Sequence, residues 1–403
     1  MRKLSFTTTL SFIFLALHAQ SIIDIDLTEA QFGVMPASKI FEDIKYIPLE
    51  THMDGLLNTH WTTFYLTDKH IIACNSFTSA YLFDRSTGSF IRKVSSFGRG
   101  PNEYSGRIFN LYGFDEKNNF LFANDDGSVN SKYWKCINVA TNKVDMIVNS
   151  PLSEDSKERF APYAPWLIKD NVYVSFCNNQ TGKNKVKLVI FDRDGNLIKK
   201  YPNYAEYDNS NSSSMSSMPA YNGIFYYYNA ITYFKERNYN DTVFRVDENK
   251  ITPHIVFKLG NRQPSYYHQR NGDYNRGKYL INFVYESDSY VLFNFNYFSE
   301  TGRGPTGQPI GMKTTTHTGY YDKKSNQVYI SSSPNFEQSG YIATDFSICF
   351  YPIAINQNNE MIAIIDPEEL VKYKDNIDPK YKQLFQNIHE DDNPIVIIAK
   401  LKD

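Results

Sequence analysis

One pattern of apolar runs and polar turns recurs along the chain, and it constrains the fold more than any other feature. Each copy has an apolar run, a turn, a second apolar run, a polar hairpin and a third run. The hairpins are "FDRSTG", "INVATN", "FDRDGN", "FRVDEN" and "YDKKSN"; the first four are about 54 residues apart, and the fifth follows after a longer gap. Asp, Asn and Gly tolerate the left-handed backbone that tight hairpins need, so these segments are interpreted as turns between strands. The five copies are His70–Val94, Asn118–Val148, Asp170–Tyr201, Gly223–Phe257, and Ser289–Phe298 continued by Thr318–Ile330.

The length of this repeat predicts a β-propeller. A period of about 40–50 residues with four strands per unit is typical of propeller blades, each a small antiparallel sheet that buries its faces against its neighbours. The 31 Tyr and 29 Phe agree with strands, because aromatic side chains fit half-buried pleated surfaces. We therefore expect an all-β fold, a six-bladed β-propeller of four-stranded antiparallel blades. Seven blades is the alternative, because the units are long.

The two ends of the chain are expected to share the last blade. Two strands are expected in "YIATDFSICFYPIAIN" and "EMIAIID" and a third in "PIVIIAKL" (394–401), but a fourth is missing there. The segment 41–50, "FEDIKYIPLE", reads as a strand without a unit of its own. We expect it to pair with 394–401 and close the ring. Residues 20–403 then form a single propeller domain, with a helical insertion at about 366–392.

The first 19 residues have the features of a secretory signal peptide. Arg2 and Lys3 form the positive region, "LSFIFLAL" forms the apolar region, and Ala19 is a small residue at a cleavage point. The apolar run is too short to span a bilayer comfortably, and no later segment approaches the required length. A buried N-terminal strand or helix is the alternative. We expect an exported protein, periplasmic or extracellular, cleaved near Ala19, with no membrane span and no lipid anchor.

Charge, cysteine spacing and missing motifs argue against several function classes. The formal net charge of −2 does not favour a nucleic-acid partner, which would require a basic face. Cys74, Cys136, Cys177 and Cys349 lack metal-ligand spacing; buried free thiols are favoured, although export permits disulfides. No zinc-protease, paired-cysteine, serine-hydrolase or phosphate-loop motif is present, so we expect no cofactor and no metal. A metal site assembled at the axis from separate blades is the alternative.

Two motifs resemble a known family. The strand "KYIPLE" leading to "FGRGPNEY" resembles a six-bladed β-propeller family of exported proteins common in Gram-negative gut bacteria, which carries a "YIPLE"-like strand and a G-x-G-P-x-E-Y motif. The matching positions are Gly98, Gly100, Pro101, Glu103 and Tyr104. The resemblance covers essentially the whole mature chain and implies a six-bladed, NHL-like propeller. It implies no reaction, because the members are mostly uncharacterised and a fold does not dictate chemistry.

The long loops are expected on one face of the propeller. In a four-stranded meander, the first and third turns of each blade share one face, and the second turn and the crossing to the next blade share the other. The first face carries only tight hairpins, whereas the crossing face carries long segments such as "SSFGRGPNEYSG", "TGRGP" and 260–279. Long loops on a rigid scaffold are where binding usually resides. The candidate ligand-binding residues on the crossing face are Arg99, Glu103, Tyr104, Asp125, Asp126, Arg262, Arg270 and Arg303.

Several of these candidates also have a purely structural interpretation. Arg99 and Glu103 either contact a ligand, since a guanidinium suits carboxylate or sulfate groups, or form a clasp at the blade junction. The arginines and tyrosines of 260–279 either grip a sugar or an acid, or pack on the blade below. Asp125 and Asp126 either bind a cation, act as an acid/base pair, or cap backbone amides.

These patterns favour a binding module over an enzyme. We expect an exported propeller whose loop-rich face captures a glycan or a protein partner. The alternative is a polysaccharide-active enzyme, a lyase or a glycoside hydrolase with its site at the channel mouth. A hydrolase needs two carboxyl groups about 5–10 Å apart, and no sequence pattern identifies such a pair or any catalytic residue. A structural role within a surface complex is a third hypothesis.

Overall fold

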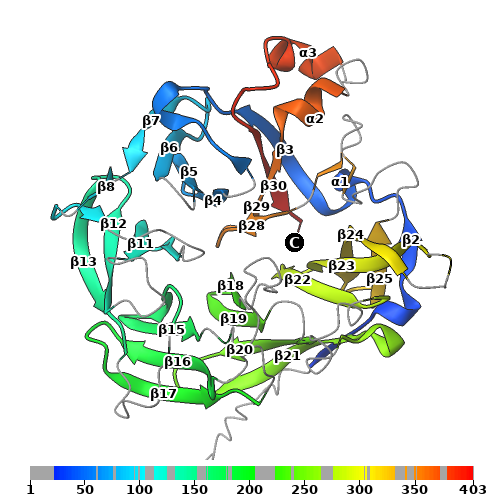
Figure 1. Cartoon of the computed structure of the whole chain (residues 1–403), viewed down its shortest axis with the longest axis horizontal. Coiled ribbons are helices and arrows are strands. Elements are labelled where there is room, and N and C mark those ends of the chain that lie inside the picture. The colour runs from blue at the N-terminus through cyan, green and yellow to red at the C-terminus, as the bar shows by residue number, and fades with distance from the viewer. Residues whose placement is uncertain are drawn as a thin grey trace, which may run out of the picture.

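Six antiparallel sheets stand in a ring around a central axis (Figure 1). The structure is a computed structural model, and it describes residues 22–59, 62–75, 79–94, 96–98, 100–104, 113–124, 132–151, 160, 162–177, 179, 184–204, 223–236, 240–264, 276–303, 305, 309–331, 341–342, 349–350, 352–372 and 379–402. The sheets are the blades of a six-bladed β-propeller, so the predicted fold class is confirmed, with six blades rather than seven.

The blades follow one another along the chain, and each runs from the axis to the rim. Blade 1 has β4 (Thr62–Leu66), β5 (His70–Asn75), β6 (Ala80–Asp84) and β7 (Phe90–Val94); blade 2 has β10 (Phe114–Asp115), β11 (Phe120–Asn124), β12 (Tyr133–Asn138) and β13 (Lys143–Asn149); blade 3 has β14 (Trp166–Lys169), β15 (Val172–Phe176), β16 (Val186–Asp192) and β17 (Leu197–Pro202). Blade 4 has β18 (Gly223–Tyr228), β19 (Ile231–Glu236), β20 (Thr242–Val246) and β21 (Ile251–Lys258); blade 5 has β22 (Tyr279–Glu286), β23 (Tyr290–Arg303), β24 (Pro309–Asp322) and β25 (Gln327–Ser331); blade 6 has β28 (Ala354–Ile355), β29 (Glu360–Ile365), β30 (Ile395–Leu401) and β3 (Phe41–Pro48). Two short pairs lie outside the blades: β8 (Ser96–Phe97) with β9 (Glu103–Tyr104), and β26 (Tyr341–Ile342) with β27 (Cys349–Phe350).

The ring is closed by strands from opposite ends of the chain, as predicted. β3 runs antiparallel to β30, and Tyr46 lies opposite Ile397 in the register. The amide of Leu49 continues the ladder by donating to the carbonyl of Pro394 at 3.1 Å. Blade 6 therefore has its fourth strand only when the two ends have met.

The N-terminal segment also extends two neighbouring blades, which the sequence patterns did not predict. β1 (Ile23–Asp26) pairs in parallel with β21 as a fifth strand of blade 4, and β2 (Gln31–Gly33) pairs in parallel with β25 of blade 5. Between β2 and β3 lies the short helix α1 (Ala37–Ile40). Each added strand covers the outer edge of its blade, where unpaired backbone groups would otherwise face solvent.

Helices and an extended hairpin occupy two of the insertions. α2 (Pro367–Lys372) and α3 (Pro379–Phe385) lie between β29 and β30, at the top of Figure 1. The Tyr46 ring of β3 makes edge contacts with the Tyr381 and Phe385 rings at centroid distances of 4.9 and 6.0 Å, so α3 packs on the closing strand. In blade 5 the insertion prolongs β23 and β24 into a hairpin of 14 residues on each side.

Apolar side chains fill the space between blades. The second strand β5 is buried along nearly its whole length, whereas the outer strand β7 alternates between partly buried and exposed positions until the buried Val94 at its end. Cys74, Cys136 and Cys177 are buried as free thiols, as the sequence favoured for them, and burial raises the pKa of the Cys136 thiol to about 12. These cysteines pack as small apolar side chains.

Truncation of a buried side chain in the closing pair tests its contribution to stability. Ile397 is fully buried between Tyr46 and Ala363. We expect Ile397→Ala to lower the free energy of unfolding by about 2–5 kcal/mol, because a cavity forms in a closed core. The matched control is Ile198→Ala on β17, where the side chain is 47% exposed and a change within about 0.5 kcal/mol is expected. Equal losses in urea unfolding for the two variants would contradict the closing role of β30.

Candidate functional site

The glycine-rich crossing after blade 1 is held together by Glu103. β8 and β9 pair in parallel, and the Glu103 carboxylate accepts a hydrogen bond from the Gly100 amide at 2.7 Å. A Cβ atom at position 98 would lie 2.0 Å from Glu103 Oε2, so the carboxylate occupies space that only glycine leaves open. The Lys135 ammonium donates to the Glu103 carbonyl at 2.6 Å and ties the crossing to blade 2. These contacts have the form of a structural clasp.

Tyr104 and Arg262 also make contacts within the protein. Tyr104 is 2% exposed, lies in the core between blades 1 and 2, and donates to Ser79 Oγ at 3.5 Å. Burial raises the pKa of Tyr104 to about 12. The Arg262 guanidinium lies over the rings of Tyr279 and Tyr297, 4.9 and 5.2 Å from their centroids. Both residues thus contribute to packing at their own blade junctions.

The side chains of the remaining predicted candidates lie outside the described residues. Arg99, Asp125, Asp126 and Arg270 lie outside the described residues. The backbone of Arg303 ends β23, but its side chain is also outside them. Glu103 and Arg262 belong to different crossings, one between blades 1 and 2 and the other between blades 4 and 5. A ligand site on the crossing face therefore stays a prediction.

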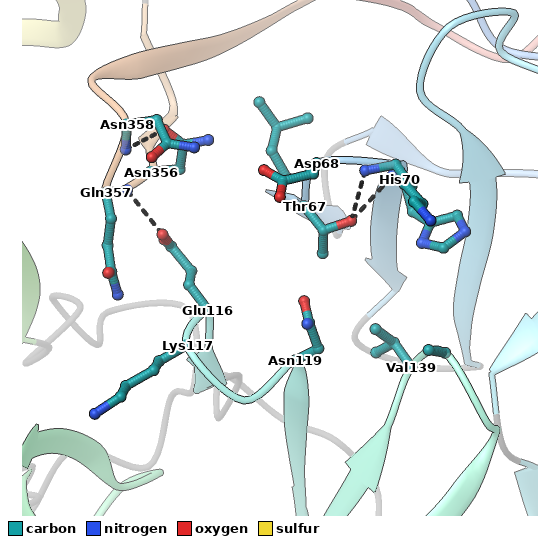
Figure 2. A pocket seen from close by; sticks show the side chains of 13 residues that line it. Thr67, Asp68, His70, Glu116, Lys117, Asn119, Val139, Asn356, Gln357 and Asn358 are labelled. Carbon is teal, nitrogen blue, oxygen red and sulfur yellow. Dashed lines mark hydrogen bonds between the residues drawn. The ribbon is translucent and has the colours of Figure 1, made fainter.

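A pocket of about 480 Å³ opens on the opposite face, where the tight hairpins lie. It is formed mainly by the inner turns of blades 6, 1 and 2, where an inner turn joins the first strand of a blade to the second. Figure 2 shows side chains from all three turns around one space. The volume is typical of small-molecule pockets, which span roughly 300–1,000 Å³. The lining residues are Leu66, Thr67, Asp68, Lys69, His70, Glu116, Lys117, Asn119, Val139, Ala140, Asn356, Gln357 and Asn358.

Short polar side chains stiffen these inner turns. In blade 1, Thr67 Oγ1 accepts from the His70 amide at 2.9 Å. In blade 2, the buried Asp115 carboxylate accepts from the backbone amide of Asn118 at 3.1 Å and from its side chain at 2.7 Å. In blade 6, Asn356 Oδ1 accepts from the amide of Asn358 at 2.9 Å. Such side-chain-to-backbone bonds fix a turn locally.

Other lining side chains are left without a partner inside the protein. In the part of the chain that the structure describes, the carboxylate of Asp68 and the side-chain amides of Asn119, Gln357 and Asn358 make no intramolecular hydrogen bond. Stiff turns therefore present unused donors and acceptors around a cavity.

Arg85 joins the blade 1 and blade 6 turns from behind. Its guanidinium donates to the Thr67 carbonyl at 2.9 Å and forms an ion pair with Glu360. The other Glu360 oxygen accepts from the Asn356 side chain at 2.8 Å. The pKa of Glu360 is lowered: burial acts to raise it, but the bonds from Arg85 and Asn356 outweigh that effect.

Arg92 makes the equivalent connection towards blade 2. Its guanidinium donates to the carbonyls of Val139 and Ala140 at 2.6 and 2.8 Å, fixing the β12–β13 hairpin against blade 1. Burial, and then the Arg92 charge, lower the pKa of His70, so this histidine is neutral at pH 7. Arg85 and Arg92 were not among the predicted site residues.

Glu116 spans the pocket wall between blades 2 and 6. Its Oε2 atom accepts from the backbone amide of Gln357 at 2.8 Å. The side chain is half-buried, and burial raises the pKa of Glu116 to about 7; the Asp115 and Glu360 carboxylates add to the rise, and the bond from Gln357 opposes it. Glu116 is therefore about half protonated at neutral pH.

A second polar cluster lies between blades 4 and 5, but it is enclosed. The Glu286 carboxylate is fully buried and contacts the Lys323 ammonium at 2.6 Å and His254 Nε2 at 2.8 Å. These contacts join β22 to β21 and to the β24–β25 turn, and Glu286 lines no pocket described above.

Metal sites and membrane-spanning helices are two further features to consider among the described residues. Among these residues, no group of three or more His, Cys, Asp or Glu side chains is arranged to hold a metal ion. Nor does any helix in them combine the length and apolar character that crossing a bilayer requires.

Comparisons with known proteins find one matching family and solved structures with a similar fold. The model of a family described as "Domain of unknown function (DUF4934)" matches residues 21–400. The solved structure of a Bacteroides fragilis protein named "Putative exported protein" superposes with a TM-score of 0.62 at 15% identity, covering 95% of this chain and 100% of that one. A member of the DUF4221 family from Bacteroides vulgatus gives a TM-score of 0.51 at 10% identity, covering 90% and 98%. At these identities the likeness shows the fold alone. No curated protein matches the sequence.

The ligand site was predicted on the crossing face because the loops there are long, whereas this pocket is built from turns of only a few residues. A signal for it is present in the sequence: the polar turns "TDKH", "DEKNN" and "NQNNE", the last two rich in asparagine, follow the first strands of three blades that adjoin once the ring is closed.

Removal of the Arg85 side chain tests how much its bonds to Thr67 and Glu360, here called the Arg85 clasp, contribute to stability. We expect Arg85→Ala to lower the free energy of unfolding by about 1–3 kcal/mol, since Glu360 loses its charge partner. Arg85→Lys should recover little, because an ammonium cannot reach both acceptors as a guanidinium does. The control is Arg193→Ala, whose side chain is 48% exposed and 4.0 Å from Asp194, and for which a change below about 0.5 kcal/mol is expected. Indistinguishable urea midpoints for the two alanine variants would contradict the clasp.

Proposed function

Because the chain belongs to the DUF4934 family, whose function is unknown, we propose a function from its own geometry: it is a binding protein that holds a polar, glycan-like ligand in the pocket between blades 6, 1 and 2. The observation that carries the proposal is the set of unpartnered polar side chains on stiff turns around the cavity. A site whose donors and acceptors are already positioned loses little entropy when a ligand binds.

The lining chemistry supports a neutral, hydroxyl-rich ligand. Side-chain amides both donate and accept, and a carboxylate accepts, which together match the paired donor and acceptor character of sugar hydroxyls. Asp68 and Lys69 contribute opposite charges, and the Lys117 ammonium lies 4.0 Å from the Asp170 carboxylate. The described lining residues include no Phe, Tyr or Trp, so we expect the ligand to meet the pocket through its polar edges rather than by stacking on such a ring.

The expected export of the protein is compatible with a glycan ligand. The proposed signal peptide, residues 1–19, would deliver the propeller to the periplasm or the cell exterior, where glycans are encountered. A protein partner on the crossing face is the second form of the binding hypothesis, since the sequence predicts that the long loops lie on that face of a rigid scaffold.

A polysaccharide-active enzyme is the alternative, and one observation favours it. Glu116, with a pKa near 7, and Asp68 line the same cavity, and a carboxylic acid that keeps its proton at neutral pH suits general acid catalysis. Binding is preferred because Glu116 already bonds to the Gln357 amide and serves as part of the wall.

A glycan-array screen of the mature chain tests the proposal. We expect binding of at least one neutral glycan, weakened about 3–10-fold by Asn119→Ala, which removes one or two hydrogen bonds to the ligand. The control is Asn171→Ala, because Asn171 also precedes the second strand of its blade and has a left-handed backbone, φ 66° against 57° for Asn119, but lies in blade 3. Silence across the array, or equal loss in both variants, rules out this pocket as a glycan site. Release of shortened products from a bound glycan would favour the enzyme.

A further inference from the structure

The contact between Glu116 and Gln357 joins two blades that are not neighbours in the ring. Glu116 lies in the inner turn of blade 2 and Gln357 in that of blade 6, with blade 1 between them. Both residues line the pocket, and Figure 2 shows the bond at its edge. A hydrogen bond of 2.8 Å therefore connects the two turns on this side of the pocket.

The charged groups around Glu116 do not neutralise it. Within the described chain, no lysine, arginine or histidine forms an ion pair with Glu116. The carboxylates of Asp115, in its own turn, and of Glu360, in blade 6, both act to raise its pKa, and the Arg85 charge is engaged by Glu360. The ionisable residues of the facing turns are Asp68, Lys69 and His70 in blade 1 and Lys117 beside Glu116.

The two forms of Glu116 therefore behave differently. The neutral acid accepts from the Gln357 amide without an uncompensated charge. The carboxylate accepts a stronger hydrogen bond from Gln357 than the neutral acid does, but burial and the repulsion of two other carboxylates outweigh that bond. The ionised side chain therefore gains by turning towards the water of the open pocket. That movement breaks the bond to Gln357 and places a charge in the ligand space.

We propose that Glu116 is a proton-operated latch, which holds the blade 2 and blade 6 turns together around the ligand when neutral and releases them when ionised. The latch regulates the site of the proposed function and rests on that function for its biological meaning. Capture is then favoured in mildly acidic surroundings and release in mildly alkaline ones.

The pH window follows from the direction of the shift. Burial raises the folded-state pKa of Glu116 from 4.5 to about 7, so the folded protein holds this proton more tightly than the unfolded chain. The resulting stabilisation is complete below about pH 4.5 and is lost as the pH rises through 7. Between pH 6 and pH 8 the neutral fraction falls about tenfold.

Hydrogen exchange of the unliganded full chain tests the latch. The probe is the Gln357 amide, followed at pH 6 and pH 8 after correction for the intrinsic pH dependence of amide exchange. We expect its protection to fall about tenfold in the wild type, with a midpoint near pH 7. Glu116→Gln, whose amide oxygen still accepts from Gln357 but cannot ionise, should show constant protection. Glu248→Gln is the control, an acid of blade 4 that pairs with Lys169 at 2.8 Å, and it should behave as the wild type.

The outcomes separate the latch from the binding hypothesis. Equal protection at both pH values in the wild type overturns the latch, and so does a fall in Glu116→Gln equal to that of the wild type. If Glu116→Gln does not fold, the wild type alone decides: protection of the Gln357 amide that does not fall with a midpoint near pH 7 overturns the latch. A tenfold fall with no glycan bound at pH 6 keeps the latch and rejects the proposed function. A glycan bound with equal affinity at both pH values, with unchanged protection, keeps the function and rejects the latch.

Discussion

The pairing of β3 with β30 is the constraint on which the rest of the structure depends. Each blade hides its faces against two neighbours, so an open ring would leave the apolar faces at its seam in water. The register that places Tyr46 opposite Ile397 joins segments from the two ends of the chain. The pocket straddles this seam, because Arg85 of blade 1 bonds to Glu360 of blade 6. Closure of the ring and assembly of the site are thus one event.

The fold could be predicted because its signal is local and repeated. Hairpins such as "FDRDGN" can be recognised from a few residues. The segment "FEDIKYIPLE" reads as a strand with no adjacent strands to form a blade of its own. β1 and β2 were missed for the opposite reason. Segments as short as "IDID" and "QFG" carry no recognisable strand period, and only the rim of an assembled blade offers them a partner.

The site was harder to predict because it is made by convergence. Asp68, Asn119 and Gln357 come from three turns far apart in the chain, and each alone resembles an ordinary polar turn. Residue type also cannot tell a clasp from a ligand contact. Glu103 bonds to a backbone amide of its own loop, whereas Glu116, in an equally unremarkable sequence, bridges two blades. The difference lies in which groups stand opposite, and that is decided by the ring.

The parallel strands β1 and β2 have a consequence for how the chain reaches its native state. They are synthesised before their partners β21 and β25, which lie more than two hundred residues later, and β3 likewise precedes its partner β30. Contacts of such high sequence separation form slowly, because the loop must close before they can stabilise anything. While the chain is still emerging from the ribosome, the residues next to its N-terminus have nowhere to dock. A leader at that end would stay accessible to the export machinery, and the propeller would complete itself only after the last strand has been made.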